Sequence, residues 1–419
     1  MISITNVFGR RVRSTLARSA CLALSTACAA CPPAAEPKND GALPLVEHDP
    51  LAYEFEAKAF TEMPAVLARI RSSPLAYFRY IVGPFAQVVC RDETIDAVPT
   101  VNLHGDAHLE QYAVADDGFG IVDFDDATLG PASLDWLRFA TSVWLSDIGG
   151  EAGARGAIDR FLEGYKRSLA DPEADLGAVE PAVARRIRAG ATSTPAEWLD
   201  MVTRMAKPMV ESDREKMLAI RAQYVRVILT QNPDLSEQFF EFKGGGPLQM
   251  GIGSAHESKF LLRVEGPTSR PDDDVILERK EMRGSRLGRC TRGKLRDPRR
   301  VIDAQSRFSR SPQRLLGYIA GEGTDFYIHA WRVHYTEVHI SDIRDAIELG
   351  ELAYDFGLQL GRGHPRSAPG SQAGIRERAA ILGAVDDVEL HLADDSRALA
   401  ARTRAGFAHF KAASEPLAQ

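Results

Sequence analysis

Two acidic clusters lie about one strand apart in the first third of the chain. The first, HGDAH, alternates histidines with an aspartate, and the second, DFDD, contains three carboxylates. These residues are His104, Asp106, His108, Asp123, Asp125 and Asp126. Carboxylate oxygens suit Mg²⁺ or Mn²⁺ better than Zn²⁺, which prefers histidine and cysteine ligands. For DFDD alone a solvated acidic turn is an equal alternative, and the nearby HGDAH motif favours a metal-binding site instead.

Short apolar runs precede both clusters and predict the elements that hold them. Val101 and Leu103 come before HGDAH, and Ile121 and Val122 come before DFDD. An apolar run that ends in polar residues is typical of a strand leading into a loop, so the two sets of carboxylates can face one cleft. Downstream, Asp135 begins a predicted helix. We expect it to cap that helix or to bond N–H groups of the first loop.

The two motifs resemble known catalytic sequences. HGDAHLEQY followed by IVDFDDATLGPASLDWLRFA is similar to the catalytic region of the aminoglycoside phosphotransferase and choline kinase branch of the protein-kinase-like fold. A closer resemblance is to the bacterial family called domain of unknown function 2252. It begins at SPLAYFR (residues 73–79), continues through both motifs to the GIGS and RKEMRGS segments, and covers most of the chain beyond Leu51. Within SPLAYFR, Arg79 is a candidate to pair with a carboxylate of the site.

The kinase-like resemblance implies roles for the clustered residues. Asp106 is the general base or positions the acceptor hydroxyl, and Asp123 is the principal metal ligand. Gln111 stands where the kinase-like pattern has a metal-binding Asn. Its extra methylene group implies a second metal contact that is longer, water-mediated or absent. The candidate sets are completed by His104 and His108 for catalysis and by Asp125 for the metal.

A glycine-rich segment and a predicted β-hairpin lie more than a hundred residues downstream. The segment KGGGPLQMGIGS (residues 243–254) precedes KFLLRVEG and VILERKEM, two runs that are typical of paired strands. By resemblance to kinase-like enzymes, Gly251, Gly253 and Ser254 cover a nucleotide, and Lys280 on the second strand anchors its phosphates. The hairpin is therefore the expected nucleotide-binding element.

Two features qualify the nucleotide-binding prediction. His256 stands where the closer family has its third glycine, so we expect a less tight cover over the nucleotide. For Lys280, an ordinary edge position is the alternative to phosphate binding. If it does bind phosphate, either Glu281 or Asp303 is expected to orient its ammonium group.

The order of these parts predicts a circular permutation. The helix IRDAIELGELAYDFGLQLGRGHPRS ends in GRGH, and it resembles the helix that directly precedes the catalytic loop in ordinary kinase-like enzymes. Here the loop lies far upstream of this helix. We therefore expect an α+β, two-lobed protein-kinase-like fold in circularly permuted order, with additional helices. Its expected parts are a helical lobe with the catalytic loop (51–242), a β-rich nucleotide-binding lobe (243–335) and a helical remainder of the larger lobe (336–419).

The N-terminal residues have the pattern of an export signal. Residues 1–18 carry four arginines and no acid, and residues 19–30 form an apolar run of small side chains. Residues 1–31 are therefore predicted to be an export signal, with Cys28 or Cys31 as the site of lipid attachment to a membrane, and residues 32–50 to be a linker. This predicts an envelope or periplasmic location, whereas an unprocessed N-terminus would leave the protein in the cytoplasm. Beyond the signal only Cys90 and Cys290 remain, and they could pair.

Composition and motifs together favour an enzyme that acts on a small molecule. The 419 residues are 44% hydrophobic and 26% charged, which is typical of a globular chain, and the net charge of −7 argues against a nucleic-acid partner. We expect a phosphotransferase that moves a phosphoryl group from ATP to a small-molecule hydroxyl with Mg²⁺ or Mn²⁺. One alternative is a metal-dependent envelope hydrolase that uses HGDAH and Asp123. The other is a non-catalytic kinase-like lipoprotein that binds a ligand.

Overall fold

A computed structural model describes most of the chain beyond the predicted export signal. The described residues are 49, 51–52, 56, 60, 63–91, 98–174, 179–248, 258–282, 284–288, 291–292, 297–320 and 325–417. All of them belong to one compact unit, His48–Gln419. The predicted export signal, nearly all of the predicted linker, the candidates Gly251, Gly253 and Ser254, and also His256 and Cys290 lie outside the described residues. Helices and antiparallel sheets make up the unit, so the predicted α+β class is confirmed.

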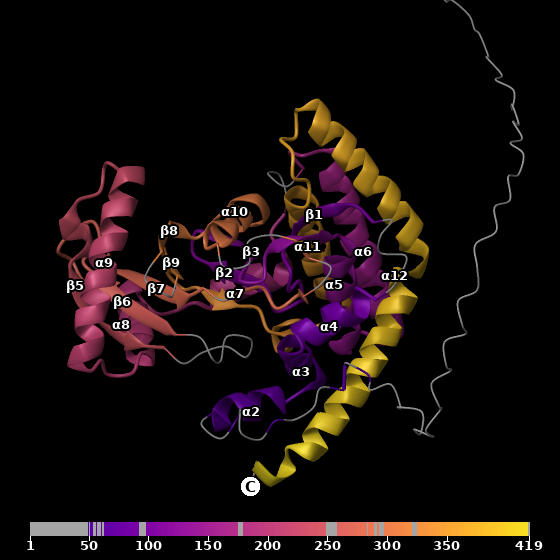
Figure 1. The fold of residues 1–419 in the computed structure, drawn as a ribbon, viewed down its shortest axis with the longest axis horizontal. Coiled ribbons are helices and arrows are strands. Elements are labelled where there is room, and N and C mark those ends of the chain that lie inside the picture. Colours follow the sequence, from indigo (N-terminus) through magenta and orange to yellow (C-terminus); the bar gives the residue numbers. More distant parts are fainter. Residues whose placement is uncertain are drawn as a thin grey trace, which may run out of the picture. The chain divides into compact units, whose positions relative to one another are not determined.

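The largest hydrophobic core lies among helices from both ends of the chain (Figure 1). It buries apolar side chains of α2 (Pro64–Ile70), α3 (Pro74–Tyr80), α4 (Val82–Val89), α5 (Ser133–Leu145), α6 (Gly150–Ala170), α7 (Ala182–Gly190), α11 (Ala346–Gly363) and α12 (Gln372–Ala413). Helices α6 and α11 approach closely because glycines line their contact. A Cβ atom added to Gly357 would lie 2.1 Å from the Phe161 carbonyl oxygen. No helix of the described residues is long and apolar enough to cross a membrane.

Two small antiparallel sheets hold the acidic motifs. Strand β1 (Thr100–Leu103) pairs with β4 (Thr128–Pro131), and β2 (Tyr112–Ala115) lies between β3 (Gly118–Ile121) and β10 (Thr336–Glu337). HGDAH follows β1 and DFDD follows β3, so the predicted strand-to-loop positions are confirmed for both motifs. The sheets bring the two loops to the same edge of the helical core.

The remaining strands form one antiparallel sheet in the order β5-β6-β7-β9-β8. Their bounds are Phe242–Pro247, Lys259–Val264 and Val275–Glu281 for β5, β6 and β7, and Arg314–Ala320 and Asp325–Ala330 for β8 and β9. The predicted hairpin, β6 with β7, and the predicted second strand pair, β8 with β9, are both present. Short 3₁₀ helices occupy Glu237–Phe240, Ile340–Asp342 and Glu415–Leu417.

Helices cover both faces of this sheet (Figure 1). One face packs against α9 (Glu211–Gln231), and the other packs against α8 (Pro195–Met205). We had placed both helices with the catalytic loop in the segment 51–242. They instead pack on the β-rich part, because their apolar faces are buried by strands that follow them in the sequence. Helix α10 (Arg299–Phe308) contacts both β8 and α11, and so connects the sheet with the helical core.

The end of α11 lies beside β1, the strand that leads into HGDAH. The backbone N–H of Asn102 donates to the His364 carbonyl at 2.9 Å. The Asn102 side-chain amide donates to the carbonyls of Gly363 and Pro365 at 3.1 and 3.0 Å. The sequence predicted this approach of the GRGH helix to the loop, although more than 250 residues separate them.

Candidate active site

A cavity of about 770 Å³ lies where the two acidic loops meet the face of the large sheet. The loops contribute carboxylates and an amide, and the sheet contributes lysines. The polar residues that matter most for chemistry are Asp106, His108, Gln111, Asp123, Asp125, Lys259 and Lys280. The described cavity therefore contains Asp106, His108 and Gln111 after the first strand, Asp123 and Asp125 of the second motif, and Lys280 of the hairpin, whereas His104 does not line it.

A buried carboxylate behind the HGDAH loop fixes the loop backbone. Asp135, in the first turn of α5, accepts the N–H of His104 at 2.7 Å and that of Gly105 at 2.9 Å. Asp135 also contacts Nε2 of His364, at the end of α11, at 3.1 Å. The turn requires glycine at position 105. Its φ is 88°, in the left-handed region, and a Cβ atom there would lie 2.3 Å from the Asp126 carbonyl oxygen. The predicted bonding of Asp135 to loop N–H groups is confirmed.

His104 joins the two acidic loops from behind the cavity. Its ring is buried against Phe124, with ring centroids 4.9 Å apart. Nε2 lies 2.9 Å from the Val122 carbonyl oxygen, and Nδ1 lies 3.3 Å from the backbone N–H of Asp106. We had included His104 among the catalytic candidates. Its contacts make it a positioning residue, because both ring nitrogens are engaged within the protein.

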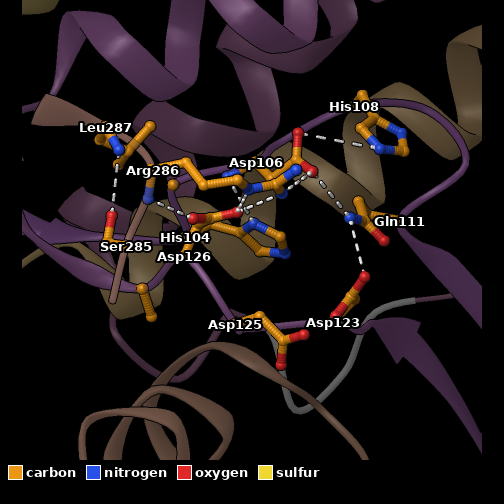
Figure 2. Close-up of polar contacts among 12 residues, drawn as sticks. His104, Asp106, His108, Gln111, Asp123, Asp125, Asp126, Ser285, Arg286 and Leu287 are labelled. Atoms are coloured by element: carbon orange, nitrogen blue, oxygen red, sulfur yellow. Dashed lines mark hydrogen bonds and ion pairs between the residues drawn. The ribbon is translucent and has the colours of Figure 1, made fainter. Parts of the chain in front are cut away.

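Two arginines contact the carboxylate of Asp106, which faces the cavity (Figure 2). Arg138 Nε donates to Asp106 Oδ1 at 2.6 Å, and Arg286 lies 3.5 Å from Oδ2. The Arg138 guanidinium stacks over Phe78 at 4.2 Å and is itself buried. Burial raises the pKa of the Asp106 carboxyl above its usual range, against the opposing charges of Arg138 and Arg286. The contacts hold this side chain in one orientation.

Gln111 lies between the carboxylates of the two motifs (Figure 2). Its amide nitrogen is 3.5 Å from Asp106 Oδ2 and 3.5 Å from Asp123 Oδ2. The Asp123 backbone has a left-handed φ of 61°, which turns its side chain away from the strand, and 44% of that side chain is exposed. Although burial raises the pKa of the Asp123 carboxyl, the charge of Lys280 outweighs it and holds the pKa well below its usual range.

Lys280 reaches the DFDD loop from the sheet. Its Nζ lies 3.2 Å from Asp123 Oδ1 and also contacts Asp125. The Tyr327 hydroxyl donates to Asp125 Oδ1 at 2.6 Å. The predicted roles of Lys280 in phosphate binding and of Asp123 in metal binding require the two side chains to share one cleft, and the structure places them in contact. Of the two acids expected to orient Lys280, Glu281 accepts the N–H of Ser258 at 3.1 Å, whereas Asp303 is exposed on α10.

His108 lies at the cavity wall as a neutral base. Burial, followed by the nearby charges of Arg79 and Arg138, lowers its pKa well below the usual range. Its Nε2 is 3.9 Å from Asp106 Oδ1, and neither ring nitrogen has a hydrogen-bond partner among the described residues. The ring nitrogens of His108 are buried, and their hydrogen-bonding capacity is not used by the described residues.

Sequence reasoning missed several residues of this site. Neither Arg138 nor Arg286 is among the predicted site residues, yet Arg138 contacts Asp106, and Arg286 binds Asp126 with its backbone N–H and Nε at 2.9 and 3.0 Å. Lys259 was also missed, although its place opposite Lys280 follows from pairing the two predicted strands. Arg79, which was considered, lines the cavity and pairs with Glu110 at 2.6 Å.

The donor set fits a metal ion that arrives with a ligand. Among the described residues, no group of three or more His, Cys, Asp or Glu side chains is assembled to hold a metal. Asp123 is nevertheless a hard donor on the cavity wall, and Gln111, whose amide nitrogen faces Asp106 and Asp123 here, would offer its amide oxygen after a rotation of the amide group. In nucleotide sites Mg²⁺ keeps waters and is held by one or two carboxylates and by phosphate oxygens. The residues therefore fit Mg²⁺ or Mn²⁺ bound together with a phosphate group.

Helix α4, which lines the cavity, ends at a cysteine that forms a disulfide bond. Cys90, which ends α4, is disulfide-bonded. Its partner lies outside the described residues, so the predicted pairing with Cys290 stays a prediction. Helix α4 also contributes Gly83 and Pro84 to the cavity wall.

Comparison with known proteins gives the chain a family. The sequence profile of a family described as uncharacterized protein conserved in bacteria (DUF2252) matches residues 61–238 and 201–413. No curated protein and no solved structure matches the chain. None of the comparisons connects it to the protein-kinase-like superfamily, so that resemblance stays a prediction. The matched ranges cover most of the sequence, and the chain belongs to the bacterial family of domain of unknown function 2252.

Proposed function

We propose that the protein is a Mg²⁺-dependent phosphotransferase that moves a phosphoryl group from a nucleotide to the hydroxyl of a small molecule. One observation carries this proposal. Asp106, Asp123 and Lys280 come from two motifs and a distant strand, and they meet in one cavity. Phosphoryl transfer depends mainly on positioning and charge neutralisation, and these three side-chain types are what it requires.

Two features of the fold support a kinase-like arrangement. In protein kinases the phosphate-binding lysine lies on the third strand of its sheet. Lys280 likewise lies on β7, the third strand of the large sheet in chain order. The contact between the end of α11 and β1 is what a circularly permuted order requires. We therefore propose a two-lobed kinase-like fold in permuted order, with β5–β9 on the nucleotide side.

The residues divide the work as follows. Asp106 would orient the acceptor hydroxyl and accept its proton, and neutral His108 would hydrogen-bond the same substrate. Asp123 and Gln111 would hold the metal ion, which when bound neutralises charge on the phosphate oxygens. Lys280 would exchange its contacts with Asp123 and Asp125 for contacts with the phosphates of the donor. Asp135 would keep the loop backbone in place throughout.

A second candidate is a ligand-binding protein without turnover. The contact between Arg138 and Asp106 favours it, because a carboxylate oxygen bonded at 2.6 Å is less available to an acceptor hydroxyl. The hydrolase alternative has less support. It would draw on His104, Asp106, His108 and Asp123 to bind metal, and the ring nitrogens of His104 already contact Val122 and Asp106 behind the loop.

Substitution of the two central aspartates tests the proposal. Asp106→Asn should leave Mg²⁺-dependent nucleotide binding nearly intact and reduce the rate of transfer by about 10²- to 10⁴-fold. Asp123→Asn should abolish the metal dependence of nucleotide binding. Calorimetry with MgATP and a phosphorylation assay over a panel of hydroxyl compounds measure the two effects, and Asp117→Asn, at an exposed carboxylate, is the control. Equal loss of binding in both variants would point to one shared metal site and favour the hydrolase.

We also propose that the protein is exported, with Cys28 or Cys31 as a site of lipid attachment. The basic and small-residue N-terminus supports this, and so does the disulfide at Cys90, because disulfides persist in oxidising compartments. Mapping the N-terminus of native protein should find a chain that starts at or near one of these cysteines. An intact Met1 in cytoplasmic material would contradict export and would place the protein where nucleotide is abundant.

A further inference from the structure

Lys259 and Lys280 lie directly opposite each other on neighbouring strands. The register of β6 and β7 pairs them, and both side chains line the cavity. Only 8% of Lys259 and 5% of Lys280 is exposed. Tyr327 is opposite Lys280 on β9, so these three residues form the row of the sheet nearest to the DFDD loop.

This lysine pair places two positive charges side by side in a mostly buried part of the sheet, where the carboxylates of Glu278, Asp123 and Asp125 offset them. Side chains directly opposite in an antiparallel pair have Cβ atoms about 4.5–5.5 Å apart, and like charges there are destabilising. Burial strengthens the repulsion because it removes solvent screening. Burial and then the charge of Lys280 lower the pKa of Lys259.

The side chains around the pair change in character along the sheet. The next row on the same face contains Leu261, Glu278 and His329, and the row beyond it contains Arg263, Ile276 and Trp331, with Arg263 paired to Asp200 and Asp274. The two lysines thus lie at the end of the face that meets Asp123 and Asp125. That is the place where a phosphate chain bound to a metal on Asp123 would extend.

We propose that Lys259 and Lys280 together form a two-point seat for adjacent phosphate groups of a linear polyphosphate chain. Lys259 is thereby a binding residue for the donor. The inference rests on the proposed function, and it adds that donor recognition comes from two lysines rather than one. A nucleoside triphosphate and inorganic tripolyphosphate both present this chemistry.

Calorimetry on the full chain with Mg²⁺ and either ATP or tripolyphosphate tests the seat. Lys259→Met and Lys280→Met should each weaken binding of both probes by roughly tenfold or more, as expected for loss of a charge-assisted contact. Lys243→Met is the matched control, because Lys243 lies on the same sheet and pairs with Asp274 and Glu265 away from the cavity. Tighter binding of ATP than of tripolyphosphate would identify a nucleotide as the source of the chain, and equal binding would identify the phosphates alone.

Thermal unfolding without ligand supplies a second readout. When it is compared with unfolding in the presence of MgATP, the upward shift of the melting temperature should become smaller in Lys259→Met, whereas Lys243→Met should keep the full shift. Wild-type affinity of Lys259→Met for both probes, with a lowered melting temperature, would overturn the seat and make Lys259 a structural partner of Glu278. Transfer that persists unchanged in Lys259→Met would sink the seat alone. Lysine-dependent binding of both probes without any transfer would sink the phosphotransferase proposal alone.

Discussion

The two walls of the cavity hold their functional side chains in different ways. On the loop wall, a single buried carboxylate, Asp135, accepts two backbone N–H groups of the HGDAH turn. On the sheet wall, regular strand pairing places Lys259 and Lys280 opposite each other. The loop wall therefore depends on a few hydrogen bonds to one carboxylate. The sheet wall distributes its support over many backbone hydrogen bonds.

Because of this difference, substitutions on the two walls should have different effects on stability and on activity. A substitution behind the loop should damage both, because the backbone that aims Asp106 is the same backbone that Asp135 holds. A substitution on the cavity face of the sheet should change charge and binding while the strands remain paired. The following predictions test this contrast, and they are ordered by the size of the expected effect.

The largest effect is expected for Asp135→Asn. The amide would place a donor against a donor, the N–H of His104 or Gly105, and would remove the buried charge that these groups and His364 share. Breaking such a buried network should lower the free energy of unfolding by about 3 kcal/mol and reduce activity as well. Chemical denaturation measures the change. Asp147→Asn, at an exposed left-handed position paired with Arg404, should stay within about 0.5 kcal/mol of wild type.

A smaller effect is expected for Tyr327→Phe on the sheet wall. The substitution removes the 2.6 Å hydrogen bond to Asp125 and leaves the packing of the ring and the strand pairing intact. The free energy of unfolding should fall by about 1–2 kcal/mol. Tyr318→Phe, opposite it on β8, is the control. If Tyr327→Phe were as damaging as Asp135→Asn, the two walls would not differ as described.

The smallest effect is expected at the rim, where His339 lies 3.6 Å from Glu110. The nearby Glu110 carboxylate raises the pKa of His339 above its usual range. A folded-state pKa above the unfolded value of about 6.5 means that this pair stabilises fully below pH 6.5 and that the contribution is lost as the pH rises through the folded-state pKa. His339→Gln should therefore lower the melting temperature slightly at pH 5.5 and leave it unchanged at high pH. If the difference in melting temperature between wild type and His339→Gln were the same at pH 5.5 and at high pH, the stabilising role of the His339–Glu110 pair would be contradicted. His391→Gln is the control for the loss of an exposed imidazole.

Local pattern was enough to predict much of the site. Apolar runs before HGDAH and DFDD predicted the strand ends, and alternation with a polar turn predicted the β6–β7 hairpin. The position of Asp135 at a helix start predicted its bonds to the loop, because a first-turn carboxylate has few other N–H groups within reach. These features depend on residues close together in sequence, where backbone geometry restricts the partners.

Tertiary structure decided which residues of each motif face the cavity. His104 and His108 alternate with Asp106, and on an extended strand all three would share one face. The left-handed turn at Gly105 instead directs His104 toward Phe124 and leaves His108 on the cavity wall. The sequence alone did not distinguish the two histidines, because their difference arises from one backbone dihedral and from helices that pack behind the loop.

The arginines and the second lysine show the same limit over longer distances. Arg138 has the spacing of a core helix residue, and its charge is tolerated only because Asp106 and the Phe78 ring meet it there. Lys259 becomes part of the site only when β6 pairs with β7 in one particular register. The sequence by itself determined the chemistry available in the two motifs and on the hairpin. The folded structure decided which charges meet, because desolvated charges are stable only beside partners that the fold brings from distant parts of the chain.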